Sequence, residues 1–157
     1  MKATLLTVGK TDIKSIAVEI DKYTKRIAHY LPFSIEVIPD IKNKRSLSQA
    51  QQKQKEGELI LSKLDRSNYV VLLDEGGQLF CSNQFAKHIE KKRNSIVNKL
   101  VFVIGGPYGF SDAVKARANE KISLSKMTFT HQMVRLIFVE QLYRAMTILN
   151  NHPYHHN

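Results

Sequence analysis

The chain contains one cysteine, no tryptophan and no long apolar run. The single cysteine, Cys81, excludes a disulfide framework and a cysteine metal cluster, and it is typical of proteins from a reducing compartment. No apolar stretch approaches the roughly 20 residues that cross a bilayer. The N-terminal run is interrupted by Gly9 too early for a signal peptide. We therefore expect a cytoplasmic protein with no membrane partner.

Positive charge is what the chain has in excess. Of its 157 residues, 24 are Lys or Arg and 14 are Asp or Glu, which gives a net charge of +10 at pH 7. Such an excess favours a polyanionic partner, nucleic acid first, although a generally basic protein without such a partner is the alternative. Hydrophobic residues make up 43% of the chain, and no break in composition separates two parts. We expect one domain over residues 1–157.

Short apolar runs alternate with amphipathic stretches along the whole chain. The runs predict strands near residues 3–8, 33–39, 69–73, 100–104 and 121–124, and the helical spacing predicts helices near 13–30, 46–64, 82–93, 111–119 and 133–149. Ser46 and Gln49 have the spacing of a capping box for the second helix, whose Gln- and Lys-rich first half is expected to face solvent. This alternation predicts an α/β fold with a mostly parallel sheet and helices on both faces. The rules of chain connection predict an unknotted, doubly wound sheet.

Two of the expected strands end in glycine-rich turns. Residues 100–104 run into Gly-Gly-Pro at 105–107, and residues 69–73 run into Asp-Glu-Gly-Gly at 74–77. Ligands bind at the carboxyl ends of strands in open α/β sheets, and glycine lets a ligand approach the backbone closely. If the two strands are neighbours, their ends form one crevice, but a simple tight turn explains the glycines equally well. Neither G-x-G-x-x-G nor G-x-x-x-x-G-K-[ST] is present, so a phosphate cradle is not expected.

Several isolated polar residues carry weaker signals. Asp74 and Glu75 are candidates for acid–base chemistry, with a solvated turn as the favoured interpretation. His29 and His88 stand alone on predicted helices and are expected at the surface. No spacing among the six histidines gives a zinc site.

The C-terminal region combines charged, aromatic and histidine side chains. Glu140 and Arg144 lie four residues apart on the last predicted helix, which is the spacing of an ordinary helical ion pair. The chain then closes with Asn-His-Pro-Tyr-His at 151–155. In this tail Tyr154 can stack on a base and His155 can bond to a base edge or a phosphate, with a disordered end as the alternative.

Four segments of the chain form a recognisable combination: V-I-G-G-P-Y-G-F at 103–110, I-S-L-S-K-M-T-F at 122–129, H-Q-M-V-R-L-I-F-V-E-Q-L-Y-R-A at 131–145 and N-H-P-Y-H at 151–155. Together they resemble the RlmH family, small bacterial methyltransferases of the SPOUT class. The resemblance extends over nearly the whole chain. It implies a trefoil-knotted α/β fold in place of the unknotted sheet, and a homodimer. It also implies methyl transfer from S-adenosylmethionine to N3 of a pseudouridine in 23S ribosomal RNA, on assembled ribosomes.

The resemblance also implies roles for individual residues. The residues implied to bind the cofactor are Leu73, Gly105, Leu124, Ser125, Lys126, Met127, Thr128 and Phe129. The implied catalytic and RNA-contacting residues are Arg144, Tyr154 and His155. Independently of the resemblance, the helical spacing of Glu140 and Arg144 makes Glu140 a candidate for orienting Arg144. A sulfonium donor leaves as a neutral thioether, so no metal is expected. His156 departs from the family pattern, in which a basic residue is expected.

Two further interpretations remain open at this point. A non-catalytic ribosome-binding or ribosome-assembly protein explains the charge and size but gives the glycine-marked strand ends no role. A small α/β enzyme that uses a nucleotide is the second alternative, and the absence of phosphate-binding motifs from the sequence counts against it.

Six basic residues are candidates for contacts with RNA phosphates, with a solvated surface as the alternative: Lys42, Lys44, Arg45, Lys91, Lys92 and Arg93.

Overall fold

The computed structural model describes residues 1–156 and is built on one five-stranded sheet in which all neighbouring strands run parallel. The strands are β1 (Lys2–Val8), β2 (Phe33–Ile38), β3 (Asn68–Leu79), β4 (Lys99–Ile104) and β5 (Glu120–Ser123). Their order across the sheet is β2-β1-β4-β3-β5. The parallel sheet confirms the predicted α/β class, and it places β3 and β4, the two glycine-marked strands, side by side.

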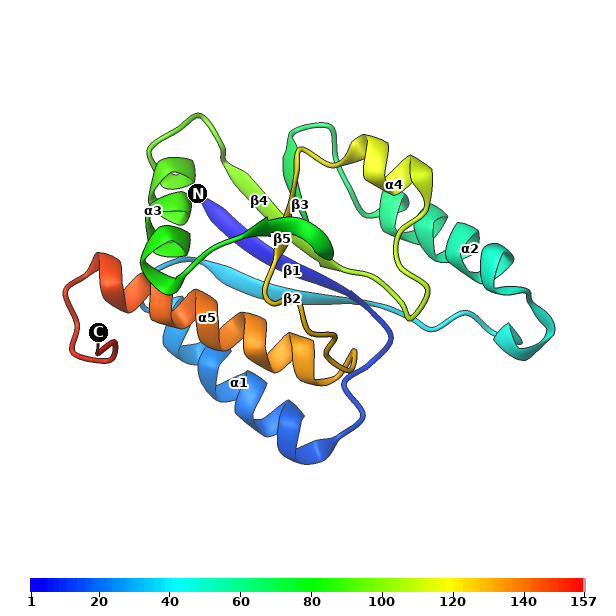
Figure 1. Ribbon diagram of the computed structural model, residues 1–157, viewed down its shortest axis with the longest axis horizontal. Coiled ribbons are helices and arrows are strands. Elements are labelled where there is room, and N and C mark those ends of the chain that lie inside the picture. The colour runs from blue at the N-terminus through cyan, green and yellow to red at the C-terminus, as the bar shows by residue number, and fades with distance from the viewer. Residues whose placement is uncertain (157) are drawn as a thin grey trace.

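Helices cover both faces of this sheet (Figure 1). They are α1 (Lys14–Ala28), α2 (Gln49–Ser62), α3 (Ser82–Arg93), α4 (Asp112–Arg117) and α5 (Met133–Leu149), with a single 3-10 turn, η1 (Lys44–Ser46). One apolar core lies between the sheet and α1, α3 and α5, and a second lies between the sheet and α2 and α4. Within residues 1–156, no helix is both long and apolar enough to cross a membrane.

The start of α2 differs from the expected position. Its capping box is formed by Ser48 and Gln51: the Ser48 hydroxyl accepts from the Gln51 backbone N–H at 3.1 Å, and the Gln51 carboxamide oxygen accepts from the Ser48 N–H at 2.9 Å. The prediction that placed the cap at Ser46 was therefore wrong by two residues, because Ser46 belongs to η1 instead.

Strand β3 is longer than the sequence pattern predicted. After residue 73 it passes through an irregular stretch and then pairs again with β5, Gln78 opposite Ile122 and Leu79 opposite Ser123. A Cβ atom at Gly77 would lie 2.5 Å from the carbonyl carbon of Ile122, so only glycine permits this close backbone approach. The end of β3 thus crosses over β5 (Figure 1), which brings residues 74–76 to the carboxyl edge of the sheet.

Candidate functional site

A cavity of about 760 Å³ opens at the carboxyl ends of β4 and β5, beside residues 73–76 of β3. Its lining comes from three segments, residues 73–76, 104–110 and 123–134. The structure therefore confirms that the two glycine-marked strand ends form one crevice, as expected for parallel neighbours. The volume lies within the range of about 300–1,000 Å³ that is usual for small-molecule sites.

Most of the residues implied to bind the cofactor line this cavity. They are Leu73, Gly105, Leu124, Ser125, Met127, Thr128 and Phe129. Lys126 is exposed and is not one of the lining residues. The Ser125 hydroxyl accepts from the Met127 backbone N–H at 2.9 Å, and the Ser125 carbonyl accepts from the Ser123 hydroxyl at 2.8 Å. These two bonds shape the loop after β5, while its contact with a cofactor stays a prediction.

The glycine turn after β4 is packed from behind by two side chains. A Cβ atom at Gly105 would meet the ring of Phe110 at 3.0 Å, and one at Gly106 would lie 2.6 Å from the carboxyl carbon of Glu56. A side chain at Gly106 would therefore displace the Glu56 carboxylate, and one at Gly105 would press on the ring of Phe110. The backbone of the turn is left as the inner wall of the cavity.

Glu56 is an unexpected buried acid behind the cavity. Its exposed fraction is 4%, and its Oε1 accepts from the Gln52 carboxamide at 2.9 Å, while Oε2 has no hydrogen-bond partner among the described residues. Burial raises the pKa of the Glu56 carboxyl above its usual range, more than the Gln52 bond and the charge of Lys44 lower it. The first half of α2 was predicted to face solvent, and for the buried Gln52 this was wrong.

A second buried charge fastens α5 to the loop after β1. Arg135 is 2% exposed, donates from Nη2 to the carbonyl of Val8 at 2.7 Å and from Nη1 to the Thr11 hydroxyl at 3.1 Å. The neighbouring Gln132 carboxamide accepts from the Asp12 backbone N–H at 2.8 Å. These polar contacts fix the first turn of α5, which forms part of the cavity wall. The apolar pattern of the helix in the sequence did not predict them.

The three predicted catalytic residues come together around Glu140 at the other end of α5. Arg144 donates from Nη2 and Nε to Glu140 Oε1, at 2.6 and 3.1 Å. Its guanidinium carbon lies 4.8 Å from the centre of the Tyr154 ring, and its Nη1 lies 3.3 Å from Nδ1 of His155. A guanidinium can only donate, so Nδ1 of His155 is the acceptor in this bond.

Tyr154 is held by protein groups on several sides. Its hydroxyl donates to Glu140 Oε1 at 3.1 Å and lies 3.1 Å from the hydroxyl of Tyr23 on α1. Its ring packs edge-on against Tyr143, with 4.7 Å between the ring centres. Burial, the Tyr23 hydrogen bond and the Glu140 charge all raise the pKa of Tyr154, so the hydroxyl keeps its proton. Sequence patterns indicated only a core position for Tyr23.

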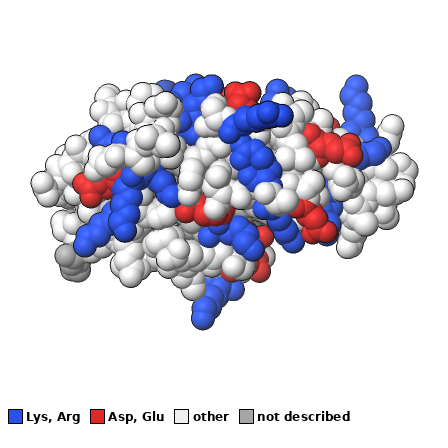
Figure 2. Space-filling model, turned by 90° about the horizontal axis from the view of Figure 1, so that it is seen from above, with Lys and Arg blue, Asp and Glu red and all other residues white. Residues whose placement is uncertain are grey.

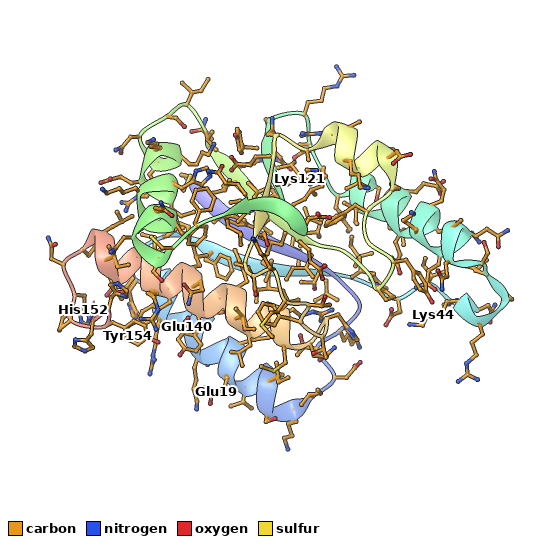
Figure 3. All side chains as sticks on the ribbon, in the orientation of Figure 1. Glu19, Lys44, Lys121, Glu140, His152 and Tyr154 are labelled. Atoms are coloured by element: carbon orange, nitrogen blue, oxygen red, sulfur yellow. The ribbon has the colours of Figure 1, made fainter. Side chains whose placement is uncertain are left out.

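The cavity borders the first turn of α5, whereas the C-terminal cluster extends from the middle of α5 into the tail. Val134, in the first turn of the helix, lines the cavity. Arg144 follows ten residues later, which corresponds to a separation of about 15 Å along a helix. Figure 3 places Glu140 on α5 and Tyr154 and His152 beyond the end of this helix. Within one chain, none of Glu140, Arg144, Tyr154 and His155 lines the cavity.

Of the six basic residues expected to contact RNA phosphates, five are exposed and one, Lys92, is bound to other protein groups. Lys92 is occupied: its ammonium is 3.4 Å from Glu120 Oε2 and donates to the Tyr69 hydroxyl at 2.7 Å. His88, expected at the surface, is half-buried and lies 2.8 Å from Glu120 Oε1. Burial alone would raise the pKa of Glu120, but His88 and Lys92 outweigh it and lower the pKa. The contacts from α3 thus brace β5.

The other basic candidates stay at the surface. They are Lys42, Lys44, Arg45, Lys91 and Arg93. Lys44 forms an exposed pair with Asp40 at 3.2 Å. On the face seen in Figure 2, Lys and Arg side chains are spread among neutral residues with fewer acidic ones between them. The positive charge is therefore distributed over this face and does not form one compact patch.

The chain is similar to known proteins over nearly its full length. A family model described as "Predicted SPOUT methyltransferase" matches residues 1–155. Proteins named Ribosomal RNA large subunit methyltransferase H from Parabacteroides distasonis, Flavobacterium johnsoniae and Bacteroides thetaiotaomicron are 62%, 58% and 57% identical to it over 156 residues, which is 99% of each chain. The chain therefore belongs to the SPOUT methyltransferases, in the family of Ribosomal RNA large subunit methyltransferase H.

Proposed function

We propose that this methyltransferase transfers a methyl group from S-adenosylmethionine to N3 of a pseudouridine in 23S ribosomal RNA. In this proposal the enzyme acts as a homodimer on assembled ribosomes in the cytoplasm. The observation that carries it is the convergence of three separate strand-end loops, each assigned to the cofactor from the sequence, on one cavity. The +10 charge of the chain suits an RNA substrate.

The chemistry of the cavity lining fits this methyl donor. Leu124, Phe129 and Val134 offer apolar surface for a nucleoside ring, and the turn at Gly105 offers backbone groups at close range. Asp74 and Glu75 also line the cavity, and their carboxylates favour a ligand that carries positive charge. When bound, S-adenosylmethionine supplies an activated methyl group on a cationic sulfur.

The cluster on Glu140 is suited to binding a uracil-like ring that must lose its N3 proton. The positive charge of Arg144 favours the deprotonated ring, and Glu140 fixes the plane of the guanidinium through two hydrogen bonds. The Tyr154 hydroxyl stays protonated and donates to Glu140 Oε1, which holds the tyrosine ring beside the guanidinium of Arg144. His155 accepts from Arg144 through Nδ1, which leaves Nε2–H as a donor toward RNA. This arrangement favours an anchoring role for His155 over a role as the base.

A homodimer reconciles the two halves of the site. In-line methyl transfer requires the reacting atoms to approach within about 3–3.5 Å, whereas Arg144 lies about 15 Å along α5 from the cavity of its own chain. In the proposed dimer the tail of one subunit completes the cavity of the other. Mixing an Arg144→Ala subunit with a subunit defective in cofactor binding tests this, since active heterodimers form only if the halves come from different chains.

We also propose the trefoil knot that the family resemblance implies. The crossing of β3 over β5 supports it, because Gly77 lies against the backbone of Ile122 and the strand re-pairs beyond that point. The chain then continues from β5 through the cavity-lining loop into α5. Family membership favours the knot against the general rule that chains are unknotted.

The proposed activity is tested with purified protein and ribosomes that lack the modification. We expect incorporation of labelled methyl into 23S RNA of the assembled ribosome, and much less into free RNA. A ribosome-assembly protein without catalytic activity would bind the same ribosomes but would neither bind S-adenosylmethionine in calorimetry nor transfer the label. Failure of both measurements contradicts the enzyme proposal.

A further inference from the structure

The last turns of α1, beside the C-terminal tail, carry three basic residues with different surroundings. Lys22 pairs with Glu19 at 2.6 Å, and Lys25 pairs with Asp21 at 2.6 Å, both on the helix surface. Arg26 has no such pair: among residues 1–156, no carboxylate lies within ion-pair distance of its guanidinium, and no hydrogen bond is made by it.

Two aromatic rings hold the guanidinium of Arg26. Its central carbon lies 5.6 Å from the ring centre of Tyr23 and 5.8 Å from that of Tyr143, both within the range of cation–π contacts. The same two tyrosines contact Tyr154, one through its hydroxyl and the other through its ring. The guanidinium of Arg26 therefore lies at the margin of the cluster that contains Arg144, and Arg26 is exposed to solvent.

These surroundings suit a phosphate. A guanidinium presents five N–H donors in a planar fork that matches phosphate oxygens, and ring contacts leave these donors free while they limit the motion of the side chain. We propose that Arg26 binds a backbone phosphate of the ribosomal RNA strand next to the target nucleotide. This inference rests on the proposed function, and it adds a substrate contact from α1 to a cluster otherwise built from α5 and the tail.

The presence of a basic residue at position 26 also has a purely structural explanation, which an experiment can distinguish from phosphate binding. Cations in the last turn of a helix interact favourably with the helix dipole, and both Lys25 and Arg26 occupy that turn of α1. The dipole acts on both side chains, but only Arg26 reaches the tyrosines of the cluster. Lys25→Gln is therefore a matched control for Arg26→Gln.

The test is the salt dependence of binding to ribosomes, measured without methyl transfer. For Arg26→Gln we expect the slope of log Kobs against log salt to decrease in magnitude by about 0.7–0.9, the value for one lost phosphate contact. Arg26→Lys should keep most of the slope because it keeps the charge. Lys25→Gln should keep the wild-type slope. In turnover, Arg26→Gln should raise KM for ribosomes with little change in kcat.

Three results would overturn the assignment. The first is a wild-type slope for Arg26→Gln, and the second is an equal loss of slope for Lys25→Gln. The third is loss of dimerisation or of S-adenosylmethionine affinity in Arg26→Gln and also in Arg26→Lys, which would show a structural role. Wild-type protein that binds ribosomes without methylating them would instead contradict the proposed function, and the slopes would still decide the role of Arg26.

Discussion

Glu140 provides the sharpest test of how the C-terminal cluster works. Its Oε1 accepts three hydrogen bonds, from Arg144 Nη2 at 2.6 Å, from Arg144 Nε at 3.1 Å and from the Tyr154 hydroxyl at 3.1 Å. Glu140→Gln keeps the size of the side chain but removes its charge. Hydrogen bonds to charged groups contribute about 1.5–3 kcal/mol when shielded from water. The Arg144 and Glu140 side chains are 25% and 19% exposed, so screening brings the expected loss in unfolding free energy to about 1–2 kcal/mol.

The expected loss in turnover by Glu140→Gln is larger than the loss in stability. A displacement of a catalytic group by about 1 Å can reduce the rate about 100-fold, and the neutral carboxamide of this variant would no longer fix both Arg144 and Tyr154. We therefore expect kcat on ribosomes to fall by about 10- to 100-fold, while calorimetry shows nearly unchanged S-adenosylmethionine affinity. Glu19→Gln, which breaks an exposed pair with Lys22, is the control and should change neither. A wild-type kcat for Glu140→Gln would refute the orienting role of this carboxylate.

Three further changes have signs that follow from the structure. Because burial raises the pKa of Glu56 above about 4.5, wild-type stability should fall as pH rises through the folded-state pKa. Denaturation should show that Glu56→Gln gains stability at pH 8 relative to pH 5; equal gains would contradict this. Because His88 and Lys92 lower the pKa of Glu120, its contribution is present above about pH 4.5 and is lost as pH falls through the folded-state pKa. Glu120→Gln should cost about 1–3 kcal/mol at pH 7 and less in acid, as measured by the same denaturation. Gly106→Ala should weaken S-adenosylmethionine binding because its Cβ would meet the Glu56 carboxyl, and Glu56→Ala should restore part of the affinity in the double variant; no rescue would refute the steric cause.

The regular elements followed from local patterns. The apolar stripe predicted the last helix at 133–149, and α5 occupies Met133–Leu149, because many apolar side chains at helical spacing must face one core. The crevice between the glycine-marked segments of β3 and β4 was likewise recognisable, since neighbouring parallel strands bring such segments to one edge of the sheet. Local periodicity and strand chemistry were sufficient for these features.

Features that depend on distant contacts could not be predicted in the same way. The extension of β3 to Leu79 depends on pairing with β5, and the burial of Glu56 depends on the turn at Gly106, which packs against it. Lys92 was expected to face RNA because its neighbours in sequence are basic, yet Glu120 and Tyr69 occupy its ammonium. No local pattern in the sequence reports such partners.

The candidate site shows the same division. Motifs placed Arg144, Tyr154 and His155 in one functional group, and the structure brings them together: Arg144 and Tyr154 bond to Glu140, and His155 bonds to Arg144. Tyr23 also contacts this group from α1, but the sequence offered only its place in an amphipathic stripe. The sequence also did not show that the cluster lies apart from the cavity. The structure shows it, because Val134 in the first turn of α5 lines the cavity and Arg144 does not.

The proposed function is tested most directly by mass spectrometry of 23S ribosomal RNA from cells that lack this protein. We predict that N3-methylpseudouridine is absent from this RNA, that the wild-type gene restores it and that Arg144→Ala, expressed at the same level, does not. Persistence of the modified nucleoside in the deletion strain, or its full restoration by Arg144→Ala, would contradict the proposed reaction or the role assigned to Arg144, respectively.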